Sequence, residues 1–395
     1  MAVRLLAEEL RREYIDKKLI ISTVTATGNK VAKGIAKEGD LLTYLPLDLS
    51  FIVRGVINRT NPSLFIIAET EIWPNLISCL YKKNIPIIVV NGRISDNSFR
   101  GYHAIKFFLR PVLNKITLFL VQTWRDQERL ISLGVAQEKI RITGNMKFDT
   151  SAASEPRPSG WGKEKPLNIN AERSRSIDFQ DYRASKKDFT DYRKKLGLQE
   201  KDKLLVAGST HPGEEEIILR AYKELKINFT DLKLLIAPRH PERSEDIAEI
   251  SWRLGFRSVF VSKDSIACST CITNQVFILD VVGELVLFYA ISDIVFVGGS
   301  LVKKGGHNIL EPAILGKPVI FGPHMFNFRD ITDLFLENNA AVLVNNEEEL
   351  MLAIKNLLLE PKRKEELSGK AKELVLQNQG ATKNNISAIK ELSYA

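Results

Sequence analysis

The chain has 395 residues, of which 44% are apolar and 26% are charged, and its formal net charge is +8. This composition is typical of a globular protein and excludes a chain that is mainly disordered, collagen-like or built of many membrane spans. No run of about 18 apolar residues occurs, so we expect no membrane-spanning helix. The basic excess favours an anionic partner, such as a phosphate-bearing substrate, an acidic membrane surface or nucleic acid.

The N-terminal third alternates short apolar runs with helical patterns. The runs are β-branched and bounded by turn residues, which is typical of buried strands, while the segment WPNLISCLYKK between two of them reads as a helix. Strand–helix alternation predicts βαβ units and a parallel sheet. The expected strands are 19–25, 41–47, 64–70, 85–92 and 116–123.

The same alternation of apolar runs and helical patterns begins again after about residue 200. A second set of apolar runs predicts another α/β half, so we expect two Rossmann-like domains facing a cleft. The predicted boundaries are 1–149 for the N-terminal domain and 201–395 for the C-terminal domain. The second set of strands is 203–210, 232–239, 276–283, 294–300, 317–324 and 341–346.

Between the two halves, residues 150–200 are expected to form a flexible insertion and linker. The segment is rich in Ser, Pro, Lys, Arg and Asp and shows neither helical nor strand periodicity. Acidic residues interrupt its basic ones, which argues against nucleic-acid binding. Cys268 and Cys271 form a lone C-x-x-C without a second pair, so we interpret them as loop residues rather than zinc ligands.

Several strand ends in the second half carry candidate binding residues. Gly305 and Gly306 allow close backbone approach, and a helix is expected to start near Asn308, where free N–H groups suit a phosphate. Glu311, in the first turn, could accept hydrogen bonds from ribose hydroxyls. The alternative is a structural turn followed by a helix-favouring glutamate.

Three further motifs follow predicted strands. Ser209 or Thr210 could cap a helix, or could bind a ligand at the carboxyl edge of the sheet. Arg239, in PRHPER, could hold a phosphate or carboxylate through its planar guanidinium. The segment Val282–Gly283–Glu284 is, from its residues alone, loop structure.

The first half offers two candidates. Glu69 and Glu71 follow a strand, where carboxylates are costly unless they are solvated or paired. Lys147 closes the domain and could face the cleft. Each motif alone is weak.

Together the motifs resemble one family, the 3-deoxy-D-manno-octulosonic acid (Kdo) transferases. Their order and spacing fit nearly the whole chain except the 150–195 segment. The six motifs are ETEIWPNL (69–76), NMKFD (145–149), GSTHPGEEE (208–216), PRHPER (238–243), GGHNILEP (305–312) and FGPHMFNF (321–328).

The resemblance implies an α/β GT-B glycosyltransferase that moves Kdo from CMP-Kdo to a lipid A precursor with inversion at the anomeric carbon. It implies that the N-terminal domain receives the acceptor and that Glu69 and Lys147 stabilise the transition state. Val282 stands where the family often has Met, a mild departure that leaves backbone contacts intact. The residues implied at the CMP site are Arg239, His240, Val282, Gly283, Glu284, Asn308, Ile309, Leu310 and Glu311.

CMP-Kdo carries a single phosphate, which a helix N-terminus with Lys and Arg can neutralise. No Asp-x-Asp motif lies in a suitable position. We therefore expect no obligatory metal, no cofactor and no nucleic-acid partner. The resemblance also implies that the protein works at the cytoplasmic face of the inner membrane. Residues 99–110 mix aromatic and basic side chains that could lie against an anionic membrane. The alternative is a helix that packs on the sheet with its charges solvated.

The resemblance departs most at the start of the chain. Family members begin with a membrane anchor and a first strand whose loop carries the general-base Glu, and here that Glu and strand would fall before Met1. We therefore expect a form that lacks its base, its anchor and a central strand. The alternatives are a GT-B enzyme that uses a UDP-sugar and a nucleotide-binding remnant without activity.

Overall fold

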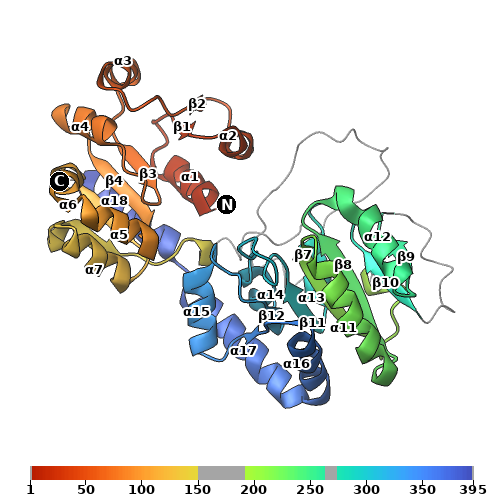
Figure 1. The fold of residues 1–395 in the computed structure, drawn as a ribbon. Coiled ribbons are helices and arrows are strands. Elements are labelled where there is room, and N and C mark those ends of the chain that lie inside the picture. Colours follow the sequence, from red (N-terminus) through yellow and green to blue (C-terminus); the bar gives the residue numbers. More distant parts are fainter. Residues whose placement is uncertain (1, 150–191, 263–273, 394–395) are drawn as a thin grey trace. The chain divides into compact units, whose positions relative to one another are not determined.

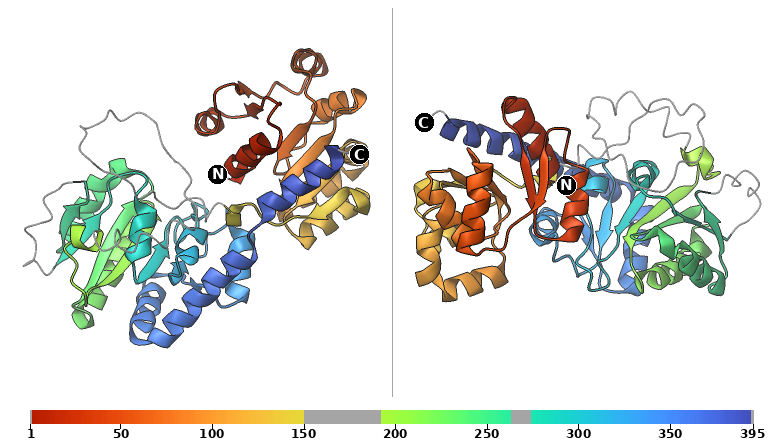
Figure 2. Two further views of the ribbon diagram at one scale, coloured as in Figure 1. Left: turned by 180° about the vertical axis from the view of Figure 1, so that it is seen from behind. Right: turned by 90° about the horizontal axis from the view of Figure 1, so that it is seen from above.

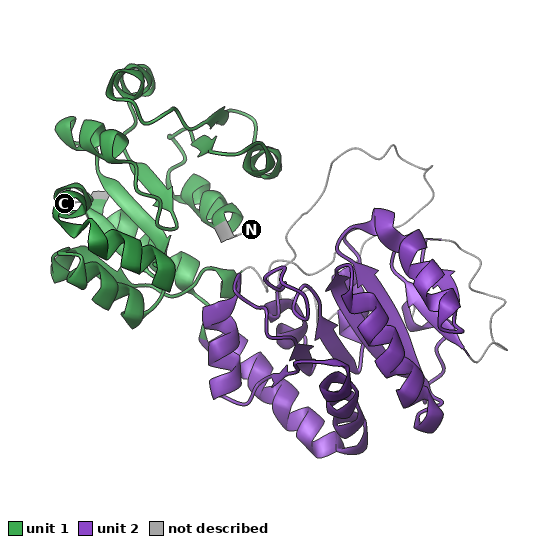
Figure 3. Ribbon diagram, viewed as in Figure 1, with its two compact units in different colours: residues 1–150, 170–173, 378–395 green, residues 151–169, 174–377 purple. Residues whose placement is uncertain are grey.

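A computed structural model describes residues 2–149, 192–262 and 274–393 (Figure 1). The chain divides into two compact units (Figure 3). Unit 1 holds the N-terminal residues up to 149 together with the C-terminal segment from 378, and unit 2 holds the described residues from 192 to 377. Most of the insertion predicted at 150–200, and both Cys268 and Cys271, lie outside the described residues.

Unit 2 is built on a seven-stranded parallel sheet in the order β13-β12-β11-β7-β8-β10-β9. The chain starts in the middle with β7, adds strands on one side, and then crosses to β11 on the other side of β7. The strand order therefore reverses between β7 and β11, the position at which open α/β sheets bind ligands. The strands are β7 Lys203–Thr210, β8 Leu232–Pro238, β9 Arg257–Phe260, β10 Gln275–Ile278, β11 Ile294–Val297, β12 Val319–Phe321 and β13 Val342–Leu343.

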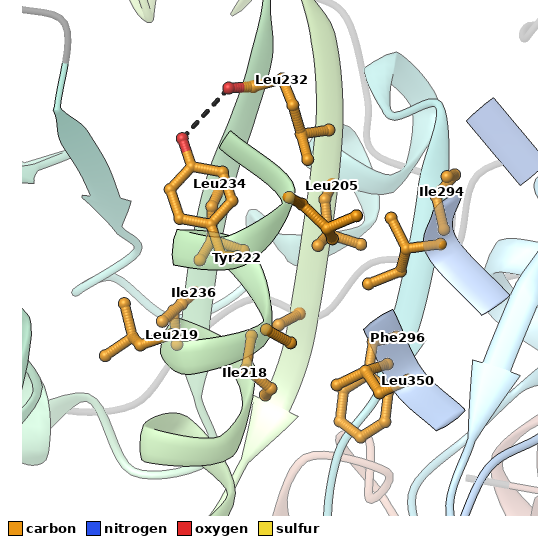
Figure 4. Packing of buried hydrophobic residues seen from close by; sticks show 14 of the residues in the cluster. Leu205, Ile218, Leu219, Tyr222, Leu232, Leu234, Ile236, Ile294, Phe296 and Leu350 are labelled. Carbon is orange, nitrogen blue, oxygen red and sulfur yellow. Dashed lines mark hydrogen bonds between the residues drawn. The ribbon is translucent and has the colours of Figure 1, made fainter. Parts of the chain in front are cut away.

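Helices cover this sheet and bury its apolar side chains. On one face Ile218 and Tyr222 of α11 pack with Leu205, Phe296 and Leu350 in one core cluster (Figure 4). The buried Tyr222 hydroxyl donates a hydrogen bond to the Leu232 carbonyl at 3.1 Å, so its polar end is satisfied. The helices are α11 Glu214–Asn228, α12 Ser244–Arg253, α13 Leu285–Ile291, α14 Leu310–Ile314, α15 Arg329–Glu337, α16 Glu347–Leu359 and α17 Pro361–Gln377.

Unit 1 contains two parallel sheets. β1 pairs with β2 alone, and the other strands form a four-stranded sheet in the order β3-β4-β5-β6. The sequence places the first five strands correctly within a few residues but indicates neither this division nor β6. The strands are β1 Ile20–Thr23, β2 Leu41–Tyr44, β3 Phe65–Ala68, β4 Ile87–Gly92, β5 Leu118–Val121 and β6 Ile140–Ile142.

The four-stranded sheet is covered on both faces, because alternate residues of β4 enter different cores. Val89 lies in the cluster with α3, α4, α6 and α7, whereas Ile88 and Val90 pack with Leu6 of α1 and Ile389 of α18. Figure 2 shows α18 running along the sheet of this unit. The helices are α1 Ala2–Glu13, α2 Ala26–Lys33, α3 Ser50–Thr60, α4 Pro74–Lys82, α5 Asp96–Ala104, α6 Lys106–Leu113, α7 Trp124–Ser132 and α18 Ala381–Ser393.

The C-terminal segment therefore packs in unit 1, although the sequence predicted 201–395 as one domain. Asp149 holds the C-terminal segment to unit 1, because its carboxylate accepts the N–H groups of Gly380 and Thr382, each at 2.6 Å. A carboxylate on the free N–H groups of a helix start is favourable, which explains why α18 begins here. In the part of the chain that the structure describes, no helix combines the length and apolarity needed to cross a membrane.

Candidate functional site

A buried carboxylate joins the two loops at the reversal point of the unit 2 sheet. Glu214, at the start of α11, is fully buried and accepts the backbone N–H of Gly299 at 2.6 Å, Ser300 at 2.9 Å, Leu301 at 2.8 Å and His211 at 3.0 Å. Burial raises the pKa of Glu214, and these four donors oppose that rise. Glu214 thereby ties the loop after β11 to the loop after β7.

The chain is packed so closely at the ends of β7 and β11 that positions 208 and 298 have no room for a side chain. A Cβ on Gly298 would lie 2.6 Å from the Ser209 carbonyl oxygen, and one on Gly208 would lie 2.0 Å from the Tyr289 hydroxyl. Ser209 has φ +57°, a left-handed conformation that is unusual for a non-glycine residue. Thr210 is fully buried, and its hydroxyl meets no hydrogen-bond partner among the described residues.

The interpretation of Ser209 or Thr210 as a helix cap is wrong. Thr210 is the last residue of β7, and α11 begins at Glu214 with Gly213 in the capping position at φ +94°. Binding is the interpretation that remains. Ser209 has a strained backbone at a strand end, and strain of this kind concentrates at ligand sites.

Three histidines and several cations gather at this edge. The Nε2 atoms of His211 and His307 lie 2.8 Å apart, and the two rings meet edge to edge with centroids 5.1 Å apart and planes 5° apart. The His240 ring centroid lies 6.2 Å from that of His211. Burial, followed by the charges of Lys304, His240, Arg243 and Arg239, lowers the pKa of His211. We name His211, His240, His307, Arg239, Arg243 and Lys304 the basic cluster.

His211 and His307 are not among the site residues predicted from the sequence. Both stand inside motifs that carry the family resemblance: GSTHPGEEE lies at the end of β7, and GGHNILEP lies in the loop that follows β11. A histidine in a loop is usually an ordinary polar residue, and only the three-dimensional structure shows that these two rings meet.

The loop before α14 holds Asn308 and Glu311 in one small network. Asn308 Oδ1 accepts the Leu310 N–H at 3.1 Å, and Asn308 Nδ2 donates to Glu311 Oε1 at 3.1 Å. Burial raises the pKa of Glu311, and the Asn308 hydrogen bond opposes that rise. The predicted helix start is confirmed to within two residues, but α14 has only five residues. Ile309 and Leu310 are fully buried, so only their backbone groups are suited to binding.

Gly305 and Gly306 pack against the following loop. A Cβ on Gly305 would lie 2.3 Å from Asn327 Nδ2, and one on Gly306 would lie 2.0 Å from the sulfur of Met325. The Asn327 N–H also donates to the Gly305 carbonyl at 3.0 Å. Close backbone approach therefore occurs here, with the FGPHMFNF loop as the partner.

The remaining candidates of unit 2 follow β8 and β10. Arg239 and His240 are exposed, and the Arg239 N–H donates to the Thr210 carbonyl at 3.0 Å. After β10, Val282 is exposed, Gly283 has φ +95°, and the Glu284 carboxylate lies 3.7 Å from Lys195 Nζ. Because all these strands are parallel, their ends share one edge of the sheet with the basic cluster.

Unit 1 brings its two candidates to one edge as well. Glu69 directly follows β3, has φ +64°, and donates its N–H to the Val90 carbonyl of β4 at 2.9 Å. The Met146 N–H donates to Asn91 Oδ1 at 3.0 Å, which carries the loop of Lys147 back over β5 to the end of β4. Since β3 is the neighbour of β4, Glu69 and Lys147 lie at the same end of adjacent strands.

No group of three or more His, Cys, Asp or Glu side chains is arranged to hold a metal ion within residues 2–149, 192–262 and 274–393. The charge that the described edge of unit 2 offers to a ligand comes from the basic cluster. Such an edge is suited to an oxyanion such as phosphate or carboxylate.

Two Rossmann-like units with ligand-binding loops at the carboxyl ends of their strands define the GT-B class of glycosyltransferases. A solved glycosyltransferase from Rickettsia africae has this fold: it matches 99% of this chain and 94% of its own with a TM-score of 0.59, at 16% sequence identity. At that identity the likeness concerns the fold alone.

The chain belongs to the 3-deoxy-D-manno-octulosonic acid (Kdo) transferase family. The family model described as 3-deoxy-D-manno-octulosonic-acid transferase matches residues 1–150. The Kdo transferase of Haemophilus influenzae is 35% identical over 98% of this chain and 82% of its own length. That of Chlamydophila psittaci is 32% identical over 85% of this chain and 69% of its own. The resemblance inferred from six motifs is confirmed.

Proposed function

We propose that the protein transfers Kdo from CMP-Kdo to a lipid A precursor, with inversion and without a metal ion. The observation that carries this proposal is the edge of unit 2, where the basic cluster lies beside the Asn308–Glu311 network at the point of strand reversal. Cations can neutralise the single phosphate of CMP, and a partly buried carboxylate can accept hydrogen bonds from ribose hydroxyls.

The proposed roles follow from this arrangement. Arg239 and His240 meet the phosphate, and the segments 282–284 and 308–311 hold the cytidine. Ser209, Thr210, Gly305 and Gly306 shape the loops around it. In unit 1, Lys147 stabilises the negative charge that develops on the leaving phosphate, and Glu69 offsets positive charge on the sugar.

Calorimetric titration with CMP tests the donor site. In Glu311→Ala we expect the Kd for CMP to rise about 10- to 100-fold, because a hydrogen bond to a charged group contributes about 1.5–3 kcal/mol. UDP, titrated in parallel, is expected to bind more weakly than CMP to the unchanged chain.

Glu348→Ala is the matched control, because this glutamate is exposed on α16, and its Kd should equal that of the unchanged chain. Equal affinity for CMP and UDP would favour a UDP-sugar enzyme. Absence of CMP binding by the folded chain would contradict the proposal.

The proposed acceptor is a lipid, so we propose that unit 1 works peripherally at the cytoplasmic face of the bacterial inner membrane. Phe107 and Phe108 are adjacent on α6 and are 85% and 77% exposed. Arg100 and Arg110 are exposed on α5 and α6. Exposed aromatic rings beside cations are suited to an anionic lipid surface.

Co-sedimentation with vesicles tests this surface. We expect Phe107→Ser/Phe108→Ser to reduce the bound fraction on vesicles rich in phosphatidylglycerol several-fold, because each ring would bury about 150–250 Å² on binding. Arg100→Glu/Arg110→Glu should reduce binding at low salt and have less effect at high salt. Unchanged binding in both variants would mean that these residues are only a solvated surface of unit 1.

A further inference from the structure

The edge-to-edge pair of His211 and His307 is the most unusual arrangement of side chains at the unit 2 edge. Two ring nitrogens 2.8 Å apart form a hydrogen bond only when one carries a proton and the other does not. The neutral pair therefore has one Nε2–H that points at a bare Nε2. The ring that donates keeps an unprotonated Nδ1, which is the atom that can take a second proton.

The surroundings of the pair keep that second proton away. Arg239 and Arg243, from the segment after β8, and Lys304, from the loop after β11, face the rings with positive charge. The His240 ring, also from the segment after β8, lies beside His211. Burial, followed by His211, Arg239 and His240, lowers the pKa of His307 to about 4.

Negative charge near the pair is already engaged. The Glu214 carboxylate accepts the backbone N–H of His211 and three N–H groups of the β11 loop. Glu215, fully buried, accepts a hydrogen bond from Arg243 at 2.8 Å. Arg243 also lies 3.8 Å from Asp246, and His240 lies 3.5 Å from Glu242. The exposed Arg239 and Lys304 are therefore the cations that an added anion would meet.

We propose that the His211–His307 pair binds an oxyanion of the donor and takes up one proton from solvent as it does so. This inference rests on the proposed donor site and names a recognition element within it. The anion cancels the repulsion among the cations, and the unprotonated Nδ1 then accepts a proton, so that the pair presents two Nδ1–H donors and one positive charge. The shared chemistry is that of a phosphate or a carboxylate, both of which CMP-Kdo carries.

The linkage has a definite sign. Burial and the surrounding cations lower the pKa of both rings, and an opposite charge nearby raises a pKa by about 1–3 units, so a bound anion raises the pKa of the pair back toward neutral pH. Between the free and the bound pKa the donor-bound state holds more protons, so donor affinity falls as pH rises, with a limiting slope of about tenfold per pH unit. Above the bound pKa the affinity no longer depends on this pair.

Calorimetry measures the proton directly. CMP is titrated into the full chain at pH 6.0 with a metal chelator present, in two buffers that differ in ionisation enthalpy, and the difference gives the protons taken up per CMP. The H211Q/H307Q variant provides the comparison, because the CMP phosphate has its own second pKa at about 6 and exchanges protons with either protein. We expect the unchanged chain to take up as much as about one proton more than the variant, and to bind CMP about tenfold more tightly.

CMP-Kdo and cytidine identify the anion. Excess proton uptake with CMP assigns the phosphate, uptake with CMP-Kdo but not with CMP assigns the sugar carboxylate, and cytidine should cause none. Should H211Q/H307Q fail to fold, the affinity of the unchanged chain for CMP-Kdo, whose phosphodiester does not titrate near pH 6, must fall between pH 5.5 and 7.5. Equal proton exchange in both proteins with CMP and also with CMP-Kdo, or an affinity for CMP-Kdo that does not change between pH 5.5 and 7.5, overturns the role of the pair and leaves the donor site standing. A folded chain that binds neither CMP nor CMP-Kdo overturns both.

Discussion

Replacing Glu69 with glutamine is expected to lower kcat for Kdo transfer by about 10²- to 10³-fold, the usual effect of removing one electrostatic group from a transition state. Glu69 directly follows β3 and holds a left-handed backbone at φ +64°. Such strain persists only where the surroundings enforce it and is concentrated at functional sites. Glutamine keeps the size of the side chain, so the loss would reflect the missing negative charge.

Single-turnover transfer of labelled Kdo to a lipid A precursor measures this effect, and calorimetry measures the Kd for CMP alongside. Glu71→Gln is the matched control, because Glu71 follows the same strand but accepts a hydrogen bond from the Trp73 indole at 3.3 Å at an exposed position. Its kcat should change less than about threefold, in keeping with a surface substitution. An unchanged rate in Glu69→Gln would remove this residue from the chemistry, and a matching loss of CMP affinity would point to a folding defect.

Replacing Glu214 with alanine is expected to produce the largest loss of stability, about 4 kcal/mol for unit 2. The substitution leaves four N–H groups without their acceptor, two buried and two partly buried, and each such group costs about 1 kcal/mol. The loops after β7 and β11 would lose their common anchor, so CMP binding should weaken as well.

Hydrogen exchange of peptides from β7 and β11, measured at rising urea concentrations, gives the local free energy of opening. Glu216→Ala is the control, because Glu216 lies in the same first turn of α11 but is exposed and paired with Arg220 along the helix. An exposed pair of this kind contributes at most about 0.5 kcal/mol. Equal exchange in the two variants would show that Glu214 does not hold the two loops together.

The parts of the fold that could be predicted are those where a local pattern determines the structure. The fully buried β4 and β5 are continuous apolar runs, so their positions follow from the sequence. β6 has only three residues, two of them exposed, and β9 begins with exposed Arg257, so neither shows a strand pattern. Their pairing depends on neighbouring strands that are distant in the sequence.

The candidate site divides in the same way. Strand ends, glycines and the Asn308–Glu311 spacing could be read as motifs because each lies within a few residues. The His211–His307 contact joins residues 96 positions apart, and the helix start at Glu214 depends on N–H groups from the loop after β11. Interactions of this range leave no periodicity in the sequence, so the structure was needed to find them.

The return of the chain to unit 1 has a consequence for the order of folding during synthesis. The core beneath α1 includes Ile386 and Ile389 of α18, which are made after the whole of unit 2. Translation proceeds at about 5–20 residues per second, so α18 is made on the order of tens of seconds after the strands of unit 1. Unit 2 is drawn from a single stretch that ends before residue 378, so all of its strands and helices are made first. The domain that is translated first is therefore the one that completes its core last, and the part of its sheet face that α18 later covers is the surface that a nascent-chain chaperone would need to protect.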